Sequence, residues 1–325
     1  MFLRILLSLP LALSLFAITG TVSAQPQYPA KAIRMVIPYP PGGGTDTLGR
    51  PIARLLGEKL GQNILIDNRG GASGMVGAEL VARSPADGYT LLMSTSGEAA
   101  LNVALYPKMN YDPVRDFAPV TQVGIAPLVL VVHPSLPAKD IKDYLALAKR
   151  QPGALSYSSI GAGSAQHIAG EWMKLLNNVN VIHVAYKGGG PQMIDLLGGH
   201  SPSAFLALPV AAPNIKSGRV RAVGMTSAKR STAFPDVPTF DESGMPGFEV
   251  SQWWAVFVPR GTATDIITRL HGELAAIIKT QEIRNRMAEL GADPVGGTPD
   301  QLGELVRSEI AKFRKIVADA KITLN

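Results

Sequence analysis

The sequence contains no cysteine, and this absence excludes several kinds of chemistry. No disulfide can form, no thiolate can bind a metal or act as a nucleophile, and no N-terminal cysteine can carry a lipid. The stability of the folded chain must therefore come from packing, which a chain of 325 residues can supply.

Charged residues are also few. They make up 17% of the chain, the net charge is only +6, and the basic residues are scattered rather than gathered in runs. This distribution argues against a nucleic-acid or membrane-binding surface, although a mild basic excess can draw small anions toward the protein. A solvated surface is the plainer explanation of the same charge. Hydrophobic residues at 46%, with 33 glycines and 25 prolines, indicate a well-buried α/β protein with many turns.

The first 24 residues differ from the rest of the chain. Arg4 precedes a stretch, residues 5–18, that is almost wholly apolar, and the small residues Val22 and Ala24 follow it. This is the pattern of a secretory signal peptide cleaved after Ala24, because the apolar stretch is short for a membrane span. An uncleaved anchor is the alternative. With no cysteine present, we expect a freely diffusing periplasmic protein that acts as a monomer.

Short apolar runs alternate with amphipathic stretches in a β-α-β order, which predicts parallel sheets. Pro51 is expected to kink the first helix or to shift its start. The predicted strands are residues 33–38, 63–67, 89–94, 127–133, 155–159, 181–186, 203–208, 220–226 and 250–258. The predicted helices are residues 47–60, 73–82, 141–150, 165–176 and 191–197, with three more within 265–279, 281–290 and 299–320.

The C-terminal part has a different character from the middle, which suggests two lobes with the tail returning to the first. We assign residues 25–122 with 233–325 to the first lobe and residues 123–232 to the second. The chain would then cross between lobes near residues 121–126 and 226–233. The fold class predicted is α/β, with a ligand cleft between two lobes.

Three glycine-rich turns follow predicted strands, at residues 42–44, 161–163 and 188–190. Glycines there let a backbone approach a ligand, and the start of the next helix offers unpaired N–H groups that favour an anion. The hydroxyl run from Ser94 to Ser96 also ends a strand. Since ligands of open parallel sheets lie at the carboxyl ends of strands, these segments together predict an anion site. Tight turns without a ligand are the alternative.

Enzyme signatures are weak. Ser164 lacks the flanking glycines of a nucleophile elbow, no Walker or dinucleotide fingerprint is complete, and the five histidines form no helical metal pair. A hydrolase using Ser164 and His167 remains an alternative, but one helical turn rarely gives a nucleophile–base geometry. We therefore expect no enzyme activity, no metal and no cofactor. Of Trp253 and Trp254, we expect one in the core and one at the surface.

At these residues the sequence resembles the tripartite tricarboxylate transporter substrate-binding family, also called the Bug family of extracytoplasmic receptors. The matching stretches are PYPPGGGTD (38–46), NRGGASG (68–74), ADGYT (86–90), YKG (186–188), DLLGG (195–199), IKSG (215–218), PDVPT (235–239) and WW (253–254). The resemblance implies a type II periplasmic binding protein that holds a small organic acid and delivers it to membrane transporter subunits. One departure is at 205–209, where Leu206 and Ala207 replace the polar pair of many relatives, so an apolar or aromatic distal end of the ligand is expected.

We therefore predict a binding protein for a small carboxylate. A ligand sensor for a signalling receptor is the alternative that sequence does not separate. The predicted ligand-binding residues are Tyr39, Pro41, Gly42, Gly43, Thr45, Asp46, Ser94, Thr95, Ser96, Gly163, Ser164, Ala165, Gln166, His167, Tyr186, Gly188 and Leu206.

Overall fold

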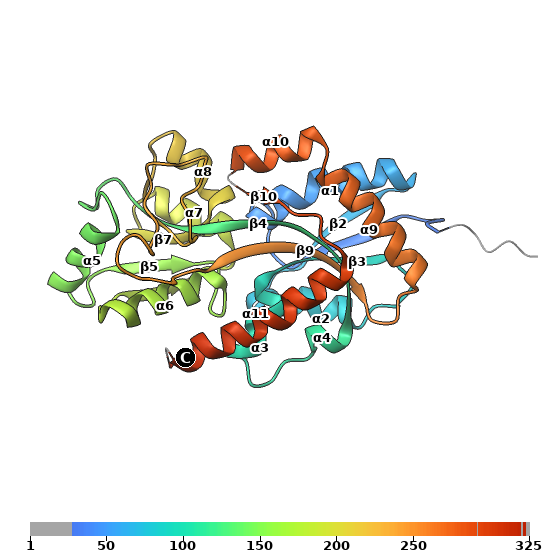
Figure 1. The fold of residues 1–325 in the computed structure, drawn as a ribbon, viewed down its shortest axis with the longest axis horizontal. Coiled ribbons are helices and arrows are strands. Elements are labelled where there is room, and N and C mark those ends of the chain that lie inside the picture. The colour runs from blue at the N-terminus through green and yellow to red at the C-terminus, as the bar shows by residue number, and fades with distance from the viewer. Residues whose placement is uncertain (1–27, 291, 320, 323–325) are drawn as a thin grey trace, which may run out of the picture.

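The chain folds into two α/β lobes that lie end to end (Figure 1). The computed structural model describes residues 28–290, 292–319 and 321–322. The predicted signal peptide, residues 1–24, lies outside the described residues. Among the described helices, none combines the length and the apolar character needed to cross a membrane.

The first lobe contains a mixed sheet whose first three strands are parallel, as the β-α-β pattern predicts. These strands have the spatial order β2-β1-β3, and β9 then pairs antiparallel with β3. The bounds of the strands are β1 Ile33–Ile37, β2 Ile64–Asn68, β3 Thr90–Thr95, β9 Ser251–Pro259 and the short β10 Asp293–Pro294. The helices are α1 Gly44–Leu60, α2 Met75–Ala82, α3 Asn102–Leu105, α4 Pro113–Asp116, α9 Thr264–Ile278, α10 Gln281–Leu290 and α11 Pro299–Asp319.

The second lobe repeats the arrangement with a smaller sheet in which β5 pairs in parallel with β6 and β7. Its strands are β5 Ser156–Ser159, β6 Ile182–Ala185, β7 Ser203–Ala207 and β8 Arg221–Met225. Its helices are α5 Ile141–Arg150, α6 Ala165–Asn177, α7 Gly189–Leu197 and α8 Leu208–Lys216.

One long strand, β4 (Phe117–Val132), belongs to both sheets (Figure 1). Its residues 117–127 pair with β9, and its residues 128–132 pair with β7 and β8. The prediction of a strand only at 127–133 was too short. Pro119 and Gly124 both lie at register shifts in the pairing with β9, where a bulge tolerates such residues.

The chain returns from the second lobe through residues 226–250. Thr239 bridges to Met225, and the ring of Phe240 stacks on Phe248 at 4.6 Å and contacts Phe205 of β7. These contacts favour a second crossing near Val250, and the lobe boundaries at 122 and 232 stay predictions.

Several helices differ from their predicted form. The first begins at Gly44 and passes Pro51 without ending, and α8, which contains Pro209 and Pro213, was not predicted. Pro209 lies in the first turn of α8, where the missing N–H would have no partner in any case. A π-helical segment, Gly97–Leu101, and the short α3 and α4 also carried no clear periodicity.

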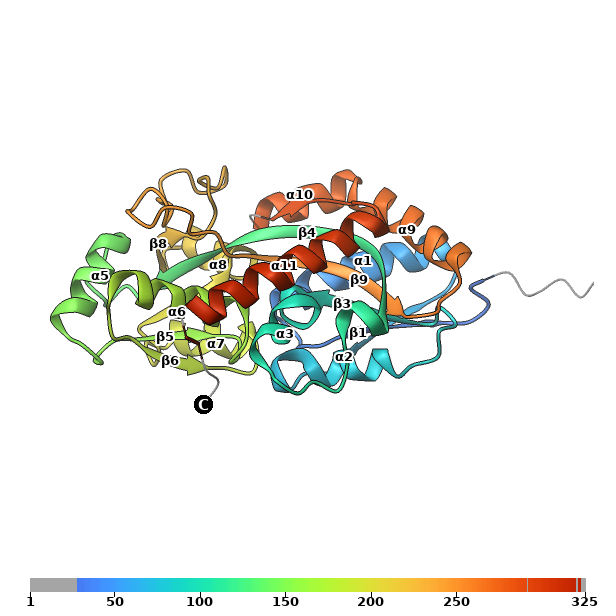
Figure 2. The ribbon, with the colours of Figure 1, turned by 60° about the horizontal axis from the view of Figure 1, so that its bottom comes forward.

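The larger of two hydrophobic clusters extends into both lobes, and the smaller one lies in the second lobe. Trp253 and Trp254 of β9 are both buried, so the prediction that one indole would lie at the surface was wrong. The strand is central in the sheet, with β3 and β4 on either side, and helices cover both of its faces. Helix α11 packs on β4 and α3, and its C-terminal end lies toward the second lobe (Figure 2).

Candidate ligand-binding site

A small cavity lies between the lobes and is lined by residues from both. Its volume is about 20 Å³, roughly the room that one water molecule needs, so an organic acid fits only if the lobes or the lining side chains move apart. No lining residue carries a charged side chain. The lining residues are Tyr39, Gly43, Gly44, Thr45, Ile160, Gln166, Gly189, Leu206, Ala207, Val210 and Gln252.

Three helices begin at this cavity. Gly43 and Gly44 are at the start of α1, Gly189 is the first residue of α7, and Gln166 lies in the first turn of α6. The amide nitrogen of Gly189 is 3.9 Å from the position that a Cβ on Gly43 would take, so the starts of α1 and α7 meet across the cleft. Unpaired N–H groups and the positive ends of the helix dipoles therefore converge from both lobes, an arrangement suited to an anion.

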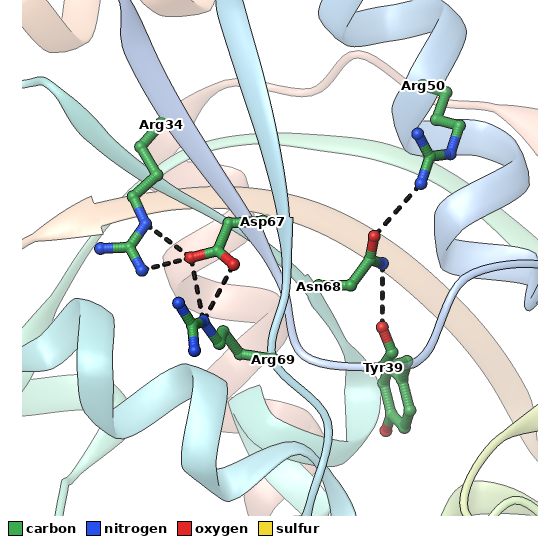
Figure 3. Close-up of polar contacts among 6 residues, drawn as sticks. All are labelled: Arg34, Tyr39, Arg50, Asp67, Asn68 and Arg69. Atoms are coloured by element: carbon green, nitrogen blue, oxygen red, sulfur yellow. Dashed lines mark hydrogen bonds and ion pairs between the residues drawn. The ribbon is translucent and has the colours of Figure 1, made fainter.

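The loop before α1 is held by polar side chains behind it. Asp46 accepts hydrogen bonds from the amide of Gly42 (3.0 Å), from Arg50 (2.8 Å) and from Asn68 (3.1 Å). Asn68 also donates to the carbonyl of Tyr39 at 2.9 Å and accepts from Arg50 (Figure 3). Burial would raise the pKa of Asp46, but these hydrogen bonds outweigh it and lower the pKa. The ionised side chain of Asp46 thus holds the loop in place from behind. Its carboxylate does not line the cavity.

A second acid fixes the strand that carries Asn68. Asp67 lies between Arg34 of β1 and Arg69 and accepts hydrogen bonds from both guanidinium groups (Figure 3). Burial would raise the pKa of Asp67, but the two arginines outweigh it and lower the pKa. The stretch 67–69 therefore supports the loop.

Hydroxyl groups at the end of β3 donate hydrogen bonds to a buried acid, Glu98. Ser94 and Thr95 donate hydrogen bonds to Glu98, and the amide of Thr95 does so at 2.8 Å. Burial raises the pKa of Glu98, which is fully buried, and neighbouring Tyr39 and Thr95 lower it only in part. Ser94, Thr95 and Ser96 are buried behind the cavity and do not line it. Glu98 was not among the predicted residues, since nothing in the local sequence marks it as buried.

The second glycine loop is organised around Ser164. Its hydroxyl donates to the carbonyl of Gly161 at 2.7 Å and accepts from the amide of His167 at 3.2 Å, which makes it the N-cap of α6. The Nδ1 atom of His167 accepts from the amide of Gly163, and the ring stacks on His183 at 4.1 Å. Burial lowers the pKa of His167 to about 4. Ser164 and His167 thus meet through a backbone amide, without the side-chain contact that a nucleophile and its base require.

The remaining predicted residues take structural positions. Tyr186 donates its hydroxyl to Asp195 of α7 at 2.7 Å, which anchors the third glycine turn. A Cβ on Gly188 would lie 3.2 Å from Pro40, so this glycine lets the two lobes approach. Pro41 contributes its carbonyl near Gly190 in the same contact.

Of the predicted ligand-binding residues, the cavity is lined by Tyr39, Gly43, Thr45, Gln166 and Leu206. The others lie around it: Ser94 and Thr95 at the end of β3, and the rest, including Gly42, Gly163 and Ala165, in loops or helix starts. The prediction missed Gly44, Ile160, Gly189, Ala207, Val210 and Gln252. The glycine triplets were a signal for Gly44 and Gly189, whereas Val210 and Gln252 reach the cavity only through tertiary packing.

Comparison with known proteins identifies the family. The sequence profile described as "Tripartite tricarboxylate transporter family receptor" matches residues 48–322. The chain belongs to this receptor family. Protein BugT of Bordetella pertussis is 37% identical over 317 residues, which cover 97% of each chain. A protein encoded in the tcbD-tcbE intergenic region of Pseudomonas sp. (strain P51) is 35% identical over 99% of this chain and 95% of its own length.

Solved structures of receptors in the family share the fold. A Rhodopseudomonas palustris protein solved with adipate is 38% identical, with a TM-score of 0.89 over 91% of this chain and 99% of that one. MatC from Rhodopseudomonas palustris with bound malate is 32% identical, with a TM-score of 0.85 over 89% of this chain and all of that one. The periplasmic binding protein BugD is 31% identical, with a TM-score of 0.87 over 91% of this chain and 99% of that one.

These likenesses confirm the predicted resemblance and the two-lobed periplasmic binding fold. Because the family consists of solute receptors, the chain is a binding protein and not an enzyme. The hydrolase alternative is therefore set aside on family membership as well as on the geometry of Ser164.

Proposed function

We propose that the protein captures a small organic carboxylate between its lobes and delivers it to the membrane subunits of a tripartite transporter. The observation that carries this proposal is the meeting of two helix starts, α1 at Gly43 and Gly44 and α7 at Gly189, at one cavity with no charged lining side chain. Each helix start favours an anion by about 0.3–1 kcal/mol, and by up to about 2 kcal/mol when partly buried. Receptors of the same family have been solved with adipate and with malate, which supports a carboxylate.

We place the carboxylate against the amides of Gly43, Gly44 and Gly189 and the hydroxyl of Thr45. Only closed lobes bring the amides from both sides to one ligand, so binding favours the closed state. All the residues that line the cavity belong to a single chain, so the site needs no second copy. We therefore propose that the protein acts as a monomer. Family members are periplasmic, and we propose that export removes residues 1–24.

Calorimetry with a panel of carboxylates and their matched primary amides tests the proposal. We expect the acid of each binding pair to bind at least tenfold more tightly than its amide, because only the acid carries the charge that the helix starts favour. Equal binding of acid and amide would show that the cavity is no anion site. N-terminal sequencing of exported material is expected to return Gln25, and a chain that begins at Met1 would contradict cleavage.

A further inference from the structure

Two glutamines form a pair across the cleft beside the proposed carboxylate site. Gln166 lies in the first turn of α6 in the second lobe, and Gln252 lies on β9 in the sheet of the first. The Nε2 atom of Gln166 donates to the Oε1 atom of Gln252 at 2.8 Å. Both side chains line the cavity, although Gln166 is only 1% exposed and Gln252 only 4%.

The pair leaves hydrogen-bonding capacity unused. The Oε1 atom of Gln166 is buried and has no partner among the described residues. The amide nitrogen of Gln252 donates to no residue in the described part of the chain. A side-chain amide has an NH2 group that donates and a carbonyl that accepts, so the joined pair still presents the carbonyl of Gln166 and the NH2 group of Gln252 without partners. A buried polar group needs a partner, and because Gln166 lines the cavity, a molecule bound there can supply it.

This conclusion does not depend on which way the amides point. Oxygen and nitrogen of a glutamine are assigned from their hydrogen bonds. If both amides turn over together, Gln252 donates to Gln166 and the pair is preserved. The acceptor and the donor then exchange places, but one of each still remains.

A ligand group that satisfies both positions must donate and accept at once. A hydroxyl and a carboxamide do so, whereas an ionised carboxylate only accepts, an ammonium only donates, and an alkyl end does neither. An ionised group also has no countercharge here, because no charged side chain lines the cavity. The wall next to the pair is apolar, formed by Leu206, Ala207 and Val210, and it suits the methylene chain that joins the two ends of the ligand.

We propose that Gln166 and Gln252 determine specificity by reading a neutral group that both donates and accepts, at the end of the ligand opposite its carboxylate. This inference rests on the proposed carboxylate function. The ligand class is a short aliphatic carboxylate that carries a hydroxyl or a carboxamide. The apolar distal end expected from Leu206 is thus replaced by an apolar chain with a neutral polar tip.

The test compares ligands that differ only at the distal end. Calorimetry measures the dissociation constants of butyrate, 4-hydroxybutyrate, succinamate and succinate, and of the six-carbon series hexanoate, 6-hydroxyhexanoate, adipamate and adipate. In at least one series we expect the hydroxyl or the amide member to bind about tenfold more tightly than both the alkyl acid and the diacid. The two neutral members show which of the two groups is read.

Variants then assign the preference to the pair. In Gln166→Leu, and separately in Gln252→Leu, we expect the tenfold advantage over the alkyl acid to vanish. Gln281→Leu on the surface of α10 is the control and keeps the advantage. Thermal unfolding shows whether each variant is folded. If one of the two pair variants does not fold, the other still tests the role of the pair.

The outcomes separate the inference from the function on which it rests. Tightest binding of the diacid or the alkyl acid, or an advantage that persists in both pair variants, overturns the inference and leaves the carboxylate function standing. If no acid of either series binds the wild type, both the inference and the carboxylate proposal are overturned.

Discussion

The indole nitrogen of Trp254 donates a hydrogen bond to the hydroxyl of Thr45 at 3.2 Å. This bond ties the central strand β9 to the first turn of α1, directly behind the cavity. Both residues are buried, and a Cβ on Gly44 would lie 3.5 Å from the same indole. The start of α1, on which the proposed anion site depends, is therefore set against a fixed aromatic side chain.

Trp254→Phe tests this support. The variant loses the hydrogen bond and part of the buried volume, so the free energy of unfolding in urea is expected to fall by about 1–3 kcal/mol. Ligand affinity is expected to fall as well, because the start of α1 loses its anchor. Trp253→Phe is the matched control: its indole donates to Glu309, away from the cavity, so it loses stability with little change in affinity. Equal effects of both variants on affinity would contradict this role.

Two neighbouring glycines are expected to respond differently to substitution. Gly42 has a φ of 85°, so Gly42→Ala strains the loop and lowers stability by about 1 kcal/mol, although its Cβ meets no atom within 4 Å. Gly43 has a φ of −80°, which any residue adopts, and its Cβ points toward Gly189. Gly43→Val should therefore fold normally. Its ligand affinity should fall at least tenfold, a loss of about 1.4 kcal/mol in binding free energy. Urea unfolding and calorimetry separate the two effects.

Ser164→Ala removes an N-cap and, with it, the bond to the carbonyl of Gly161. We expect the free energy of unfolding to fall by about 1 kcal/mol. Because the hydroxyl lies outside the cavity lining, affinity should change by no more than about fivefold, through the position of Gln166. Ser164→Thr keeps the hydroxyl and should restore most of the stability. A loss of binding without a loss of stability would instead indicate direct ligand contact.

The stacked histidines predict a pH dependence of stability. Unfolded histidine titrates near pH 6.5, but burial lowers the pKa of His167 to about 4 and that of His183 to about 3. The folded state thus binds fewer protons than the unfolded state in this range. Stability should be complete above about pH 6.5 and should fall as the pH drops toward 4, by on the order of 1 kcal/mol per histidine per pH unit.

His183→Gln removes one titrating group of the stacked pair. We expect stability to fall less steeply between pH 6.5 and 4 than in the wild type. Urea unfolding at each pH measures this. His200→Gln, at an exposed position, should leave the slope unchanged. Glu98 has the opposite effect on stability, because its raised pKa makes the folded state bind more protons than the unfolded state. All the variants retain Glu98, so its contribution cancels when their slopes are compared. An unchanged slope in His183→Gln would refute the assignment.

Hydrogen bonds to one carbonyl of the second glycine turn, residues 161–163, join the lobes. The hydroxyls of Ser73 and Tyr106, in the first lobe, both donate to the carbonyl of Ala162 in the second. The double variant Ser73→Ala, Tyr106→Phe should populate more open lobes, seen as a larger radius of gyration in ligand-free X-ray scattering. Tyr111→Phe, whose hydroxyl bonds within the first lobe, is the control. Identical scattering of the double variant and the control would exclude this role.

Much of the fold could be predicted because its signals are local. The apolar alternation of β1 to β3, the periodicity of α6 and α9, and the Ser164 cap are all written in neighbouring residues. The three glycine turns could likewise be predicted, since a strand, a turn and a helix start follow one another in the chain. These turns line the cavity with backbone groups, so the sequence by itself located these loops and predicted an anion site among them.

The tertiary structure decided which side chains complete the site. Gln166 and Gln252 form a hydrogen bond although they are 86 residues apart in the sequence. Val210 reaches the cavity on α8, a helix that contains two prolines and was not predicted. The hydroxyls of Ser94 and Thr95, predicted at the ligand, donate to Glu98 and lie outside the cavity lining. A hydroxyl or an amide bonds equally well to a ligand, a backbone group or a buried acid, and only the packing of distant segments selects among these partners.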